Sequence, residues 1–191
     1  MIKCILEIKA NKVYPIAAIQ TAAYTLLDTP VDFEAEGHVY YCPDCVARLH
    51  SVTEILTAEN FIDTTWFTDY VRNRGSNIHL ACHLDDTGEL DEDTIGEVER
   101  PYLEAWRKFK HESGFIVEQS EVPMANLHYM FAGTPDKVGC FPNGNIKRAA
   151  VELHNDGGYK LIPFTDRQDI EIWKATLAVY FWKLNHLKRK E

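Results

Sequence analysis

The spacing of apolar residues changes near Gly114, and this change limits the folds that the chain can adopt. Between residues 51 and 113, apolar residues recur every three or four positions, which is typical of amphipathic helices. From Phe115 to about residue 163, short apolar runs alternate with turn sequences such as PNGN and NDGG, which indicates strands. Residues 165–186 return to helical spacing. These patterns predict an α/β (α+β) fold in which helices flank a central mixed sheet.

A strand and a helix are expected before this pattern begins, within residues 1–30. The run CILEIKA alternates as a strand does, and this alternation places Glu7 and Lys9 on one face. Pro15 suits the first turn of a helix that runs to about residue 27 and carries Gln20 and Tyr24 four positions apart. No linker rich in Gly or Ser interrupts the chain, so we expect residues 1–191 to form a single domain.

The bulk properties of the chain exclude several classes of protein. The net charge of −9 argues against broad, non-specific attraction to nucleic acid, although a local basic groove is compatible with it. No run reaches the length of a membrane span and the N-terminus lacks a signal pattern, so we expect a cytoplasmic protein with no membrane partner. The odd count of five cysteines favours reduced thiols over a disulfide framework.

The sequence CPDC raises the question of a second kind of metal site. Cys42 and Cys45 form a C-x-x-C pair, but a closed zinc or iron–sulfur site needs four ligands and the chain has one such pair. His38 and His50 could complete a Cys2His2 set, although their spacing matches no familiar pattern. We therefore expect a hairpin turn with two free thiols, without Zn²⁺ or an iron–sulfur cluster, and keep a zinc site at Cys42 and Cys45 as the alternative.

Three further stretches carry residues suited to binding a hard cation. GTPD places Asp136 beside a turn at a strand end, LEIK places Glu7 and Lys9 on another strand, and RGSNIH places His79 on a helix. If the two strands are neighbours, Asp136 and Glu7 can hold one divalent cation, and the backbone carbonyl of Ile8 could add an oxygen. Lys9 would then point at the same spot, where it could orient a water or stabilise charge on a phosphate. Such a site suits metal-dependent hydrolysis of phosphodiesters.

Several motifs together resemble one family over nearly the whole chain. The segments HSVTEIL, RGSNIH, YLEAWRKF, EQSEVP, FAGTPDKVG, LEIK and QTAAY are similar to those of PD-(D/E)XK nucleases, specifically the RecB-like exonucleases of phages and CRISPR-associated systems. The resemblance implies a restriction-endonuclease-like core, Mg²⁺ or Mn²⁺ as cofactor, and linear or single-stranded DNA ends as substrate. It also implies the cytoplasm of a bacterium or phage-infected host, and a phage recombination or replication protein as partner.

The resemblance assigns roles residue by residue. The metal-binding and catalytic roles fall on His79, Asp136, Glu7 and Lys9. Gln20 and Tyr24 match a glutamine–tyrosine element that contacts DNA and braces the site. Glu121, on the strand before GTPD, is a further acidic candidate, and the basic Arg74 is a further candidate for binding substrate.

One departure from the family concerns the order of the chain. In the family the acidic-x-lysine strand and the glutamine–tyrosine helix follow the GTPD strand, whereas here residues 1–30 carry them and residues 31–191 the remainder. This transposed segment could complete the site in its own chain or, by a segment swap in a homo-oligomer, in a neighbouring one. Aligning only the GTPD hairpin would instead put Glu152 and His154 in the acidic-x-lysine positions, where histidine is a poor substitute. We favour Glu7 and Lys9, because the glutamine–tyrosine pair follows them at the family's spacing.

A second interpretation keeps the nuclease fold without its catalysis. The protein would then be a DNA- or protein-binding module, for example a phage inhibitor of a host nuclease. Its acidity suits a protein that mimics DNA or binds a basic partner.

Overall fold

The computed structural model describes residues 2–34, 39–63 and 68–187, which pack as two compact units. The first unit comprises Met1–Ala17, Trp66–Val122 and Pro135–Thr165, and the second comprises Ala18–Thr65, Pro123–Thr134 and Asp166–Glu191. The described residues form a mixed α+β fold with five α-helices and two mixed sheets, which confirms the predicted fold class. The single domain expected from the sequence stays a prediction, and the two units are described in turn.

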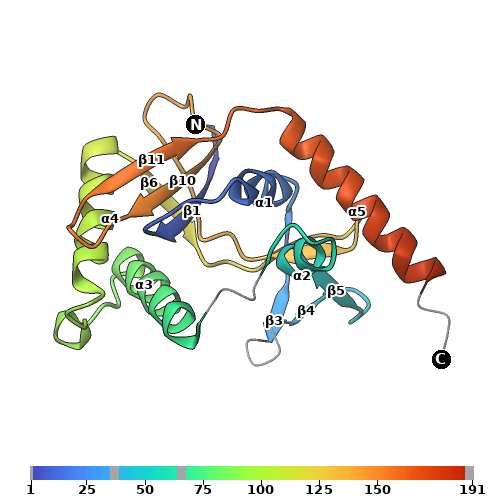
Figure 1. The fold of residues 1–191 in the computed structure, drawn as a ribbon, viewed down its shortest axis with the longest axis horizontal. Coiled ribbons are helices and arrows are strands. Elements are labelled where there is room, and N and C mark those ends of the chain that lie inside the picture. Colours follow the sequence, from blue (N-terminus) through green and yellow to red (C-terminus); the bar gives the residue numbers. More distant parts are fainter. Residues whose placement is uncertain (1, 35–38, 64–67, 188–191) are drawn as a thin grey trace. The chain divides into compact units, whose positions relative to one another are not determined.

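The sheet of the first unit has the N-terminal strand at its centre (Figure 1). Its strand order is β11 (Tyr159–Pro163), β10 (Arg148–Leu153), β1 (Cys4–Ala10), β9 (Lys137–Cys140) and β6 (Ile116–Ser120). β1 is parallel to β10 and antiparallel to β9, with Glu7 opposite Ala150 and Lys9 opposite Glu152. Residues opposite each other on neighbouring strands share a face, so Glu7, Lys9 and Glu152 lie on one side of the sheet.

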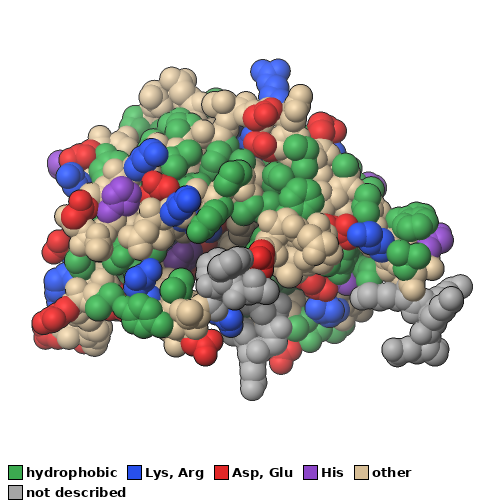
Figure 2. Space-filling view, in the orientation of Figure 1, with side chains coloured by type: hydrophobic (Ala, Val, Ile, Leu, Met, Phe, Trp, Pro, Cys, Tyr) green, Lys and Arg blue, Asp and Glu red, His purple; other side chains and the backbone are tan. Residues whose placement is uncertain are grey.

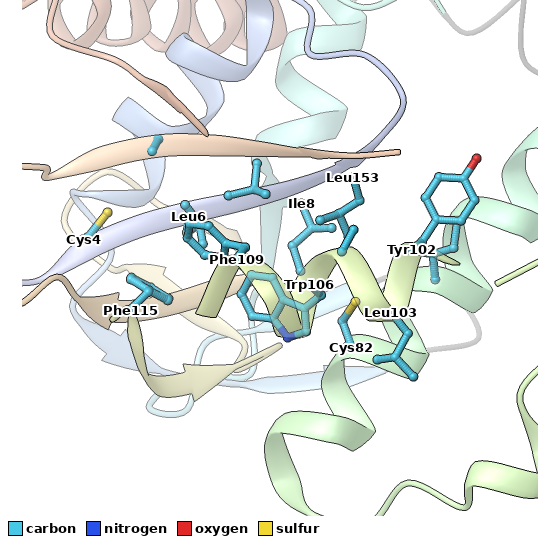
Figure 3. Packing of buried hydrophobic residues seen from close by; sticks show 14 of the residues in the cluster. Cys4, Leu6, Ile8, Cys82, Tyr102, Leu103, Trp106, Phe109, Phe115 and Leu153 are labelled. Atoms are coloured by element: carbon cyan, nitrogen blue, oxygen red, sulfur yellow. The ribbon is translucent and has the colours of Figure 1, made fainter. Parts of the chain in front are cut away.

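The other side of this sheet forms the hydrophobic core of the first unit. Leu6 and Ile8 of β1 are fully buried there. They point toward Trp106 and Phe109 of the helix α4 (Arg100–Ser113), as Figure 3 shows. The helix α3 (Asp69–Thr87) adds Ile78 and Cys82 to the same core. The alternation expected for CILEIKA is thus confirmed: Cys4, Leu6 and Ile8 enter the core, whereas Glu7 and Lys9 lie on the opposite face.

The ends of the two helices follow from local sequence. α4 has Pro101 in its first turn and ends at Gly114, whose φ of +67° is the left-handed conformation that favours glycine. α3 begins after Thr68, whose side chain accepts a hydrogen bond from the backbone N–H of Val71. A short 3-10 helix, η1 (Glu92–Thr94), lies between them.

The second unit contains a second sheet, and its separation from the first is the feature that the sequence did not predict. Its order is β2 (Thr29–Pro30), β7 (Met124–Asn126), β8 (Phe131–Gly133), β5 (Arg48–Ser51), β4 (Val39–Tyr41) and β3 (Asp32–Glu34). These strands span only two to four residues each, which is too short for a clear alternation of apolar and polar positions. The described strands therefore form two mixed sheets, which is compatible with the predicted core around a central mixed sheet.

Three helices complete the second unit. α1 (Ile16–Tyr24) begins in the first unit and has its remaining residues in the second. α2 (Val52–Ala58) follows Ser51, and Ser51 and Glu54 form a capping box of the kind that the sequence SVTE indicates. α5 (Gln168–His186) ends the described chain. None of the helices in the described ranges is both long and apolar enough to cross a bilayer.

Candidate metal centre

Three side chains of the first unit converge at one end of its sheet. His79 comes from α3, Glu121 follows the last residue of β6, and Asp136 precedes the first residue of β9. One potential ligand atom from each of the three lies within 4.8 Å of the other two. His79 Nδ1 is 3.4 Å from Asp136 Oδ1 and 3.6 Å from Glu121 Oε1. The arrangement joins one nitrogen and two carboxylate groups around a common point, which is a donor set for a metal ion.

The backbone fixes the position of Asp136 from two sides. Its Oδ2 accepts a hydrogen bond of 2.7 Å from the backbone N–H of Ile8 on β1. Its backbone carbonyl accepts one of 3.1 Å from the N–H of Glu121. Glu121 has a φ of +53°, a left-handed conformation that is unfavourable for a residue with a Cβ and that recurs at functional sites. The strand β1 is therefore tied directly to the carboxylate of the GTPD turn.

Glu7 and Lys9 form a close ion pair on β1. Lys9 Nζ lies 2.6 Å from Glu7 Oε2, and the side chain of Glu7 is 1% exposed whereas that of Lys9 is 28% exposed. The other carboxylate oxygen of Glu7, Oε1, is buried and has no hydrogen-bond partner. A buried carboxylate oxygen without a partner is unfavourable unless a proton or a cation satisfies it.

The two central groups of the site are both charged in the neutral range. Burial alone would raise the pKa of Asp136, but the positive charges of His79 and Lys9 hold that pKa well below its ordinary value. Burial also disfavours the charged form of His79, but the carboxylates of Asp136 and Glu121 outweigh it and raise the pKa of His79 to about 10. In the absence of a metal, His79 is thus a cation that neutralises Asp136.

In the ion pair on β1, the carboxyl group has a pKa near neutral pH. Burial, together with the charge of Asp136, raises the pKa of Glu7 to about 7, even though Lys9 pulls it down. Burial disfavours the charged form of Lys9, but Glu7 and Asp136 outweigh it, so the pKa of Lys9 is raised. Glu7 therefore exchanges its proton near neutral pH, while Lys9 stays charged.

The residues present fit a hard divalent cation. Glu7 Oε1 and Glu121 Oε1 are both buried carboxylate oxygens without a hydrogen-bond partner, so each has a lone pair to offer. Carboxylate oxygens suit Mg²⁺ and Mn²⁺ alike, and imidazole is a common ligand of transition metals. Displacement of the proton from His79 would free its nitrogen for the ion.

The alternative acidic-x-histidine pair lies next to β1 and is otherwise engaged. Glu152 Oε1 accepts a hydrogen bond of 2.6 Å from the backbone N–H of Val13. His154 Nε2 is 3.8 Å from Glu152 Oε2. This carboxylate therefore holds the loop that follows β1. The backbone N–H of Ile8 is the group that reaches Asp136, and ligation by the Ile8 carbonyl stays a prediction.

The residues expected to bind substrate divide between the two units. Gln20 and Tyr24 belong to the second unit, where Gln20 Nε2 donates a 3.0 Å hydrogen bond to the Tyr24 hydroxyl. A Cβ on Gly133 would lie 2.5 Å from the Tyr24 ring, so this glycine makes room for it. Arg74 belongs to the first unit, where its guanidinium lies 5.7 Å from the centre of the Tyr70 ring. Contact of these residues with DNA stays a prediction.

The CPDC sequence forms a turn between β4 and β5, as expected. Cys42 is buried, Cys45 is exposed, and both are free thiols. A hydrogen bond from the Cys45 thiol lowers the pKa of Cys42. Among the described residues, no group of three or more potential ligands includes either cysteine. His50 contacts Glu54 and Tyr180, and His38 lies outside the described residues.

Sequence reasoning missed one residue beside the centre. Lys137 directly follows Asp136 and is completely buried, where it pairs with Asp86 of α3. A lysine after a turn reads as a solvated residue, so nothing in GTPDK by itself reveals the burial. One signal was available in the sequence: Asp86 lies seven residues after His79, so a helix places this acidic residue on the same face as the candidate ligand.

No protein-family model, no curated protein and no solved structure matches this chain.

Proposed function

We propose that this protein is a metal-dependent DNA nuclease of the PD-(D/E)XK type that hydrolyses phosphodiester bonds, as an exonuclease in phage-type DNA processing. The observation that carries the proposal is the meeting of His79, Glu121 and Asp136 within ligand distance of one another, with Ile8 of β1 bonded to Asp136. The Glu7–Lys9 pair flanks Ile8 on the same strand. These residue types are the ones that the resemblance assigns to the catalytic centre.

The strand pairing supports the transposed order of the chain. β1 and β9 are antiparallel neighbours, as two strands joined by a short hairpin would be, although more than one hundred residues separate them in sequence. Moving the acidic-x-lysine strand to the N-terminus therefore leaves its pairing with the GTPD strand intact. This favours a site that closes within one chain over one that needs a segment swap.

The roles of the side chains follow from their charges. A bound Mg²⁺ or Mn²⁺ would act as a Lewis acid that lowers the pKa of water and neutralises charge on the phosphate. Asp136, which is ionised at neutral pH, and His79 would hold it, and Glu7 and Glu121 have oxygens free to join them. Lys9 keeps its positive charge, so it can stabilise the negative charge that develops on the phosphate.

DNA binding would depend on local contacts. On the face seen in Figure 2, Lys and Arg side chains lie singly among acidic, hydrophobic and other polar ones. With a net charge of −9, attraction from a distance is weak, which suits a protein that engages DNA ends through a few residues. Gln20, Tyr24 and Arg74 are the candidates. A phage recombination or replication protein as partner, and the cytoplasm of a bacterium or phage-infected host as location, belong to the same proposal.

The net charge favours one second candidate, which is a nuclease fold that has lost catalysis and binds DNA or a protein. A strongly acidic surface can bind the basic DNA groove of a host nuclease as a mimic of DNA. In that case the ion pair of Lys9 with Glu7 would serve the fold alone.

An assay on end-labelled linear and circular DNA with Mn²⁺ or Mg²⁺ tests the proposal. We expect the wild type to degrade the linear substrate, and Asp136→Ala and Lys9→Ala each to lose about one hundredfold or more in rate. Lys12→Ala, which removes an exposed lysine of the loop after β1, is the matched control and should retain activity. A folded wild type that is inert with both metals would favour the second candidate, and a fully active Lys9→Ala would remove this lysine from the mechanism.

A further inference from the structure

A second polar cluster lies next to the candidate metal centre, and all of its residues belong to the first unit. Lys137 is 0% exposed, and its Nζ lies 2.8 Å from Asp86 Oδ2 and donates a 2.6 Å hydrogen bond to Ser120 Oγ. Ser120 Oγ is also 2.8 Å from His83 Nδ1. Neither the resemblance nor the proposed reaction uses these residues. A buried lysine is rare, because taking an ammonium group out of water is costly, and it calls for an explanation.

The cluster joins the same three elements that supply the candidate metal ligands. Lys137 is the neighbour of Asp136 at the start of β9, and Ser120 is the neighbour of Glu121 at the end of β6. On α3, His83 and Asp86 follow His79 by four and seven residues. At 3.6 residues per turn, these three side chains project from one face of the helix. Each of the three elements therefore carries a candidate metal ligand and, near it, a residue of the second cluster. The residues of this cluster contact one another across the three elements.

The geometry limits how far the three elements can move relative to each other. Sliding α3 along β9 would separate Lys137 from Asp86 and leave the buried ammonium group of Lys137 without a carboxylate partner, which is strongly unfavourable. Asp86 is held in turn from α4, because its Oδ1 lies 2.6 Å from Lys110 Nζ and accepts a 3.0 Å hydrogen bond from Trp106 Nε1. Lys110 thus holds the same carboxylate from α4, and its ion pairs are with Asp85 and Asp86, both on α3.

We infer that Lys137 is a positioning residue for the metal centre: its ion pair with Asp86 and its hydrogen bond to Ser120 set the separation of His79, Glu121 and Asp136. The inference rests on the proposed function, since it takes these three residues as metal ligands. It adds that the affinity for the ion depends on a lysine that has no contact with the ion itself.

Lys137→Met, with Lys110→Met as its matched control, tests the inference. Both variants remove one ammonium group from Asp86, and only the first releases β9 from α3. We expect both to unfold at lower urea concentration than the wild type. Measured by calorimetry with Mn²⁺ alone, under conditions where both are folded by circular dichroism, Lys137→Met should raise the Kd about tenfold or more. Lys110→Met should bind within about twofold of the wild type.

The outcomes separate this inference from the proposed function. If the wild type binds Mn²⁺ and folded Lys137→Met binds it as tightly as Lys110→Met does, the positioning role is wrong while the metal centre stands. If Lys137→Met does not fold, Ser120→Ala decides, because it deletes only the hydroxyl between Lys137 and His83. An increase in Kd of at least about threefold supports the inference, and an unchanged Kd overturns it. A wild type that binds no Mn²⁺ overturns both.

Discussion

At the scale of single residues, Glu7 is the side chain whose negative charge is least well compensated in the candidate site. Its carboxyl group is buried next to the ionised Asp136, and one of its oxygens has no partner. Two carboxylates close together in a buried site repel each other, so one of them must take up a proton or share a cation. A cation that binds both relieves this repulsion. The same contacts that weaken the metal-free fold therefore favour metal binding.

The pH dependence of stability in the absence of metal follows from Glu7. Its pKa rises from 4.5 to about 7, so the folded state holds the proton more tightly than the unfolded chain does. This contribution to stability is complete below about pH 4.5 and is lost as the pH rises through about 7. We predict that the free energy of unfolding, measured in urea with a chelator, falls between about pH 5 and 7 from this cause. The pKa of His79 rises from 6.5 to about 10, so the stability that His79 contributes is lost mainly above pH 6.5 and changes little over most of this range.

Glu7→Gln is the variant that isolates this effect, because the amide keeps the shape of the side chain and does not titrate. Its free energy of unfolding should vary less over the same pH range than that of the wild type. Equal slopes for the two proteins would show that Glu7 does not titrate near neutral pH.

The strained backbone of Glu121 gives a second residue-scale prediction. A non-glycine residue at a φ of +53° costs about 1 kcal/mol, so Glu121→Gly should be more stable than Glu121→Ala by about that amount in urea unfolding. Both variants lack the carboxylate, so both should bind Mn²⁺ more weakly than the wild type and to the same extent in calorimetry. Unchanged Mn²⁺ binding in both would exclude Glu121 as a ligand.

At the scale of elements, helices and long strands were predictable and short strands were not. The capping box at Ser51 and the glycine at the end of α4 have local hydrogen-bond chemistry that their sequence reveals. The two-residue strand β2 has no such signal, because pairing with the distant β7 rather than its own pattern makes it a strand. Neighbouring sequence also could not tell that Lys137 is buried, since its partner Asp86 lies on another element.

Two glycines of α3 make an element-scale prediction from one helix. An added Cβ meets nothing within 4 Å at Gly75 or at Gly88, but Gly75 is inside the helix whereas Gly88 caps it at a φ of +74°. Gly75→Ala should therefore raise the free energy of unfolding by about 0.5–1 kcal/mol, because alanine has the higher helix propensity. Gly88→Ala should lower it by about 1 kcal/mol, because it strains the left-handed cap. Thermal or urea unfolding of both checks this, and equal signs would contradict it.

At the scale of the whole molecule, the chain builds each unit from three stretches that are distant in sequence. His79, Glu121 and Asp136, which lie together in the structure, could be chosen from the sequence as candidate ligands, whereas the displaced order of the motifs stays a prediction. The sequence could not reveal that β1 is the central strand of its sheet, because strand order depends on packing over the full chain. It also did not reveal the division into two units, since no linker marks the boundaries and one of them falls inside α1.

The division into two units predicts which helices and strands bound Mn²⁺ should stabilise most. Bound Mn²⁺ stabilises the state that holds it, by about 2.7 kcal/mol at a free concentration about one hundred times Kd. Because all candidate ligands belong to the first unit, amide hydrogen exchange should slow most in β1, β6, β9 and α3. Exchange in β4 and β5 of the second unit should slow less. Mass spectrometry of peptides with and without Mn²⁺ checks this, and the opposite ranking would place the ion elsewhere.

The most direct test of the central claim is the anomalous scattering of Mn²⁺ in crystals of the wild-type protein soaked with the ion. We predict an anomalous peak at the end of the first unit's sheet, with His79 and Asp136 as ligands and Glu7 or Glu121 beside them. The peak should be absent from Asp136→Ala crystals soaked in the same way. A wild-type crystal that shows no peak there, or a peak whose ligands exclude Asp136, would contradict the account.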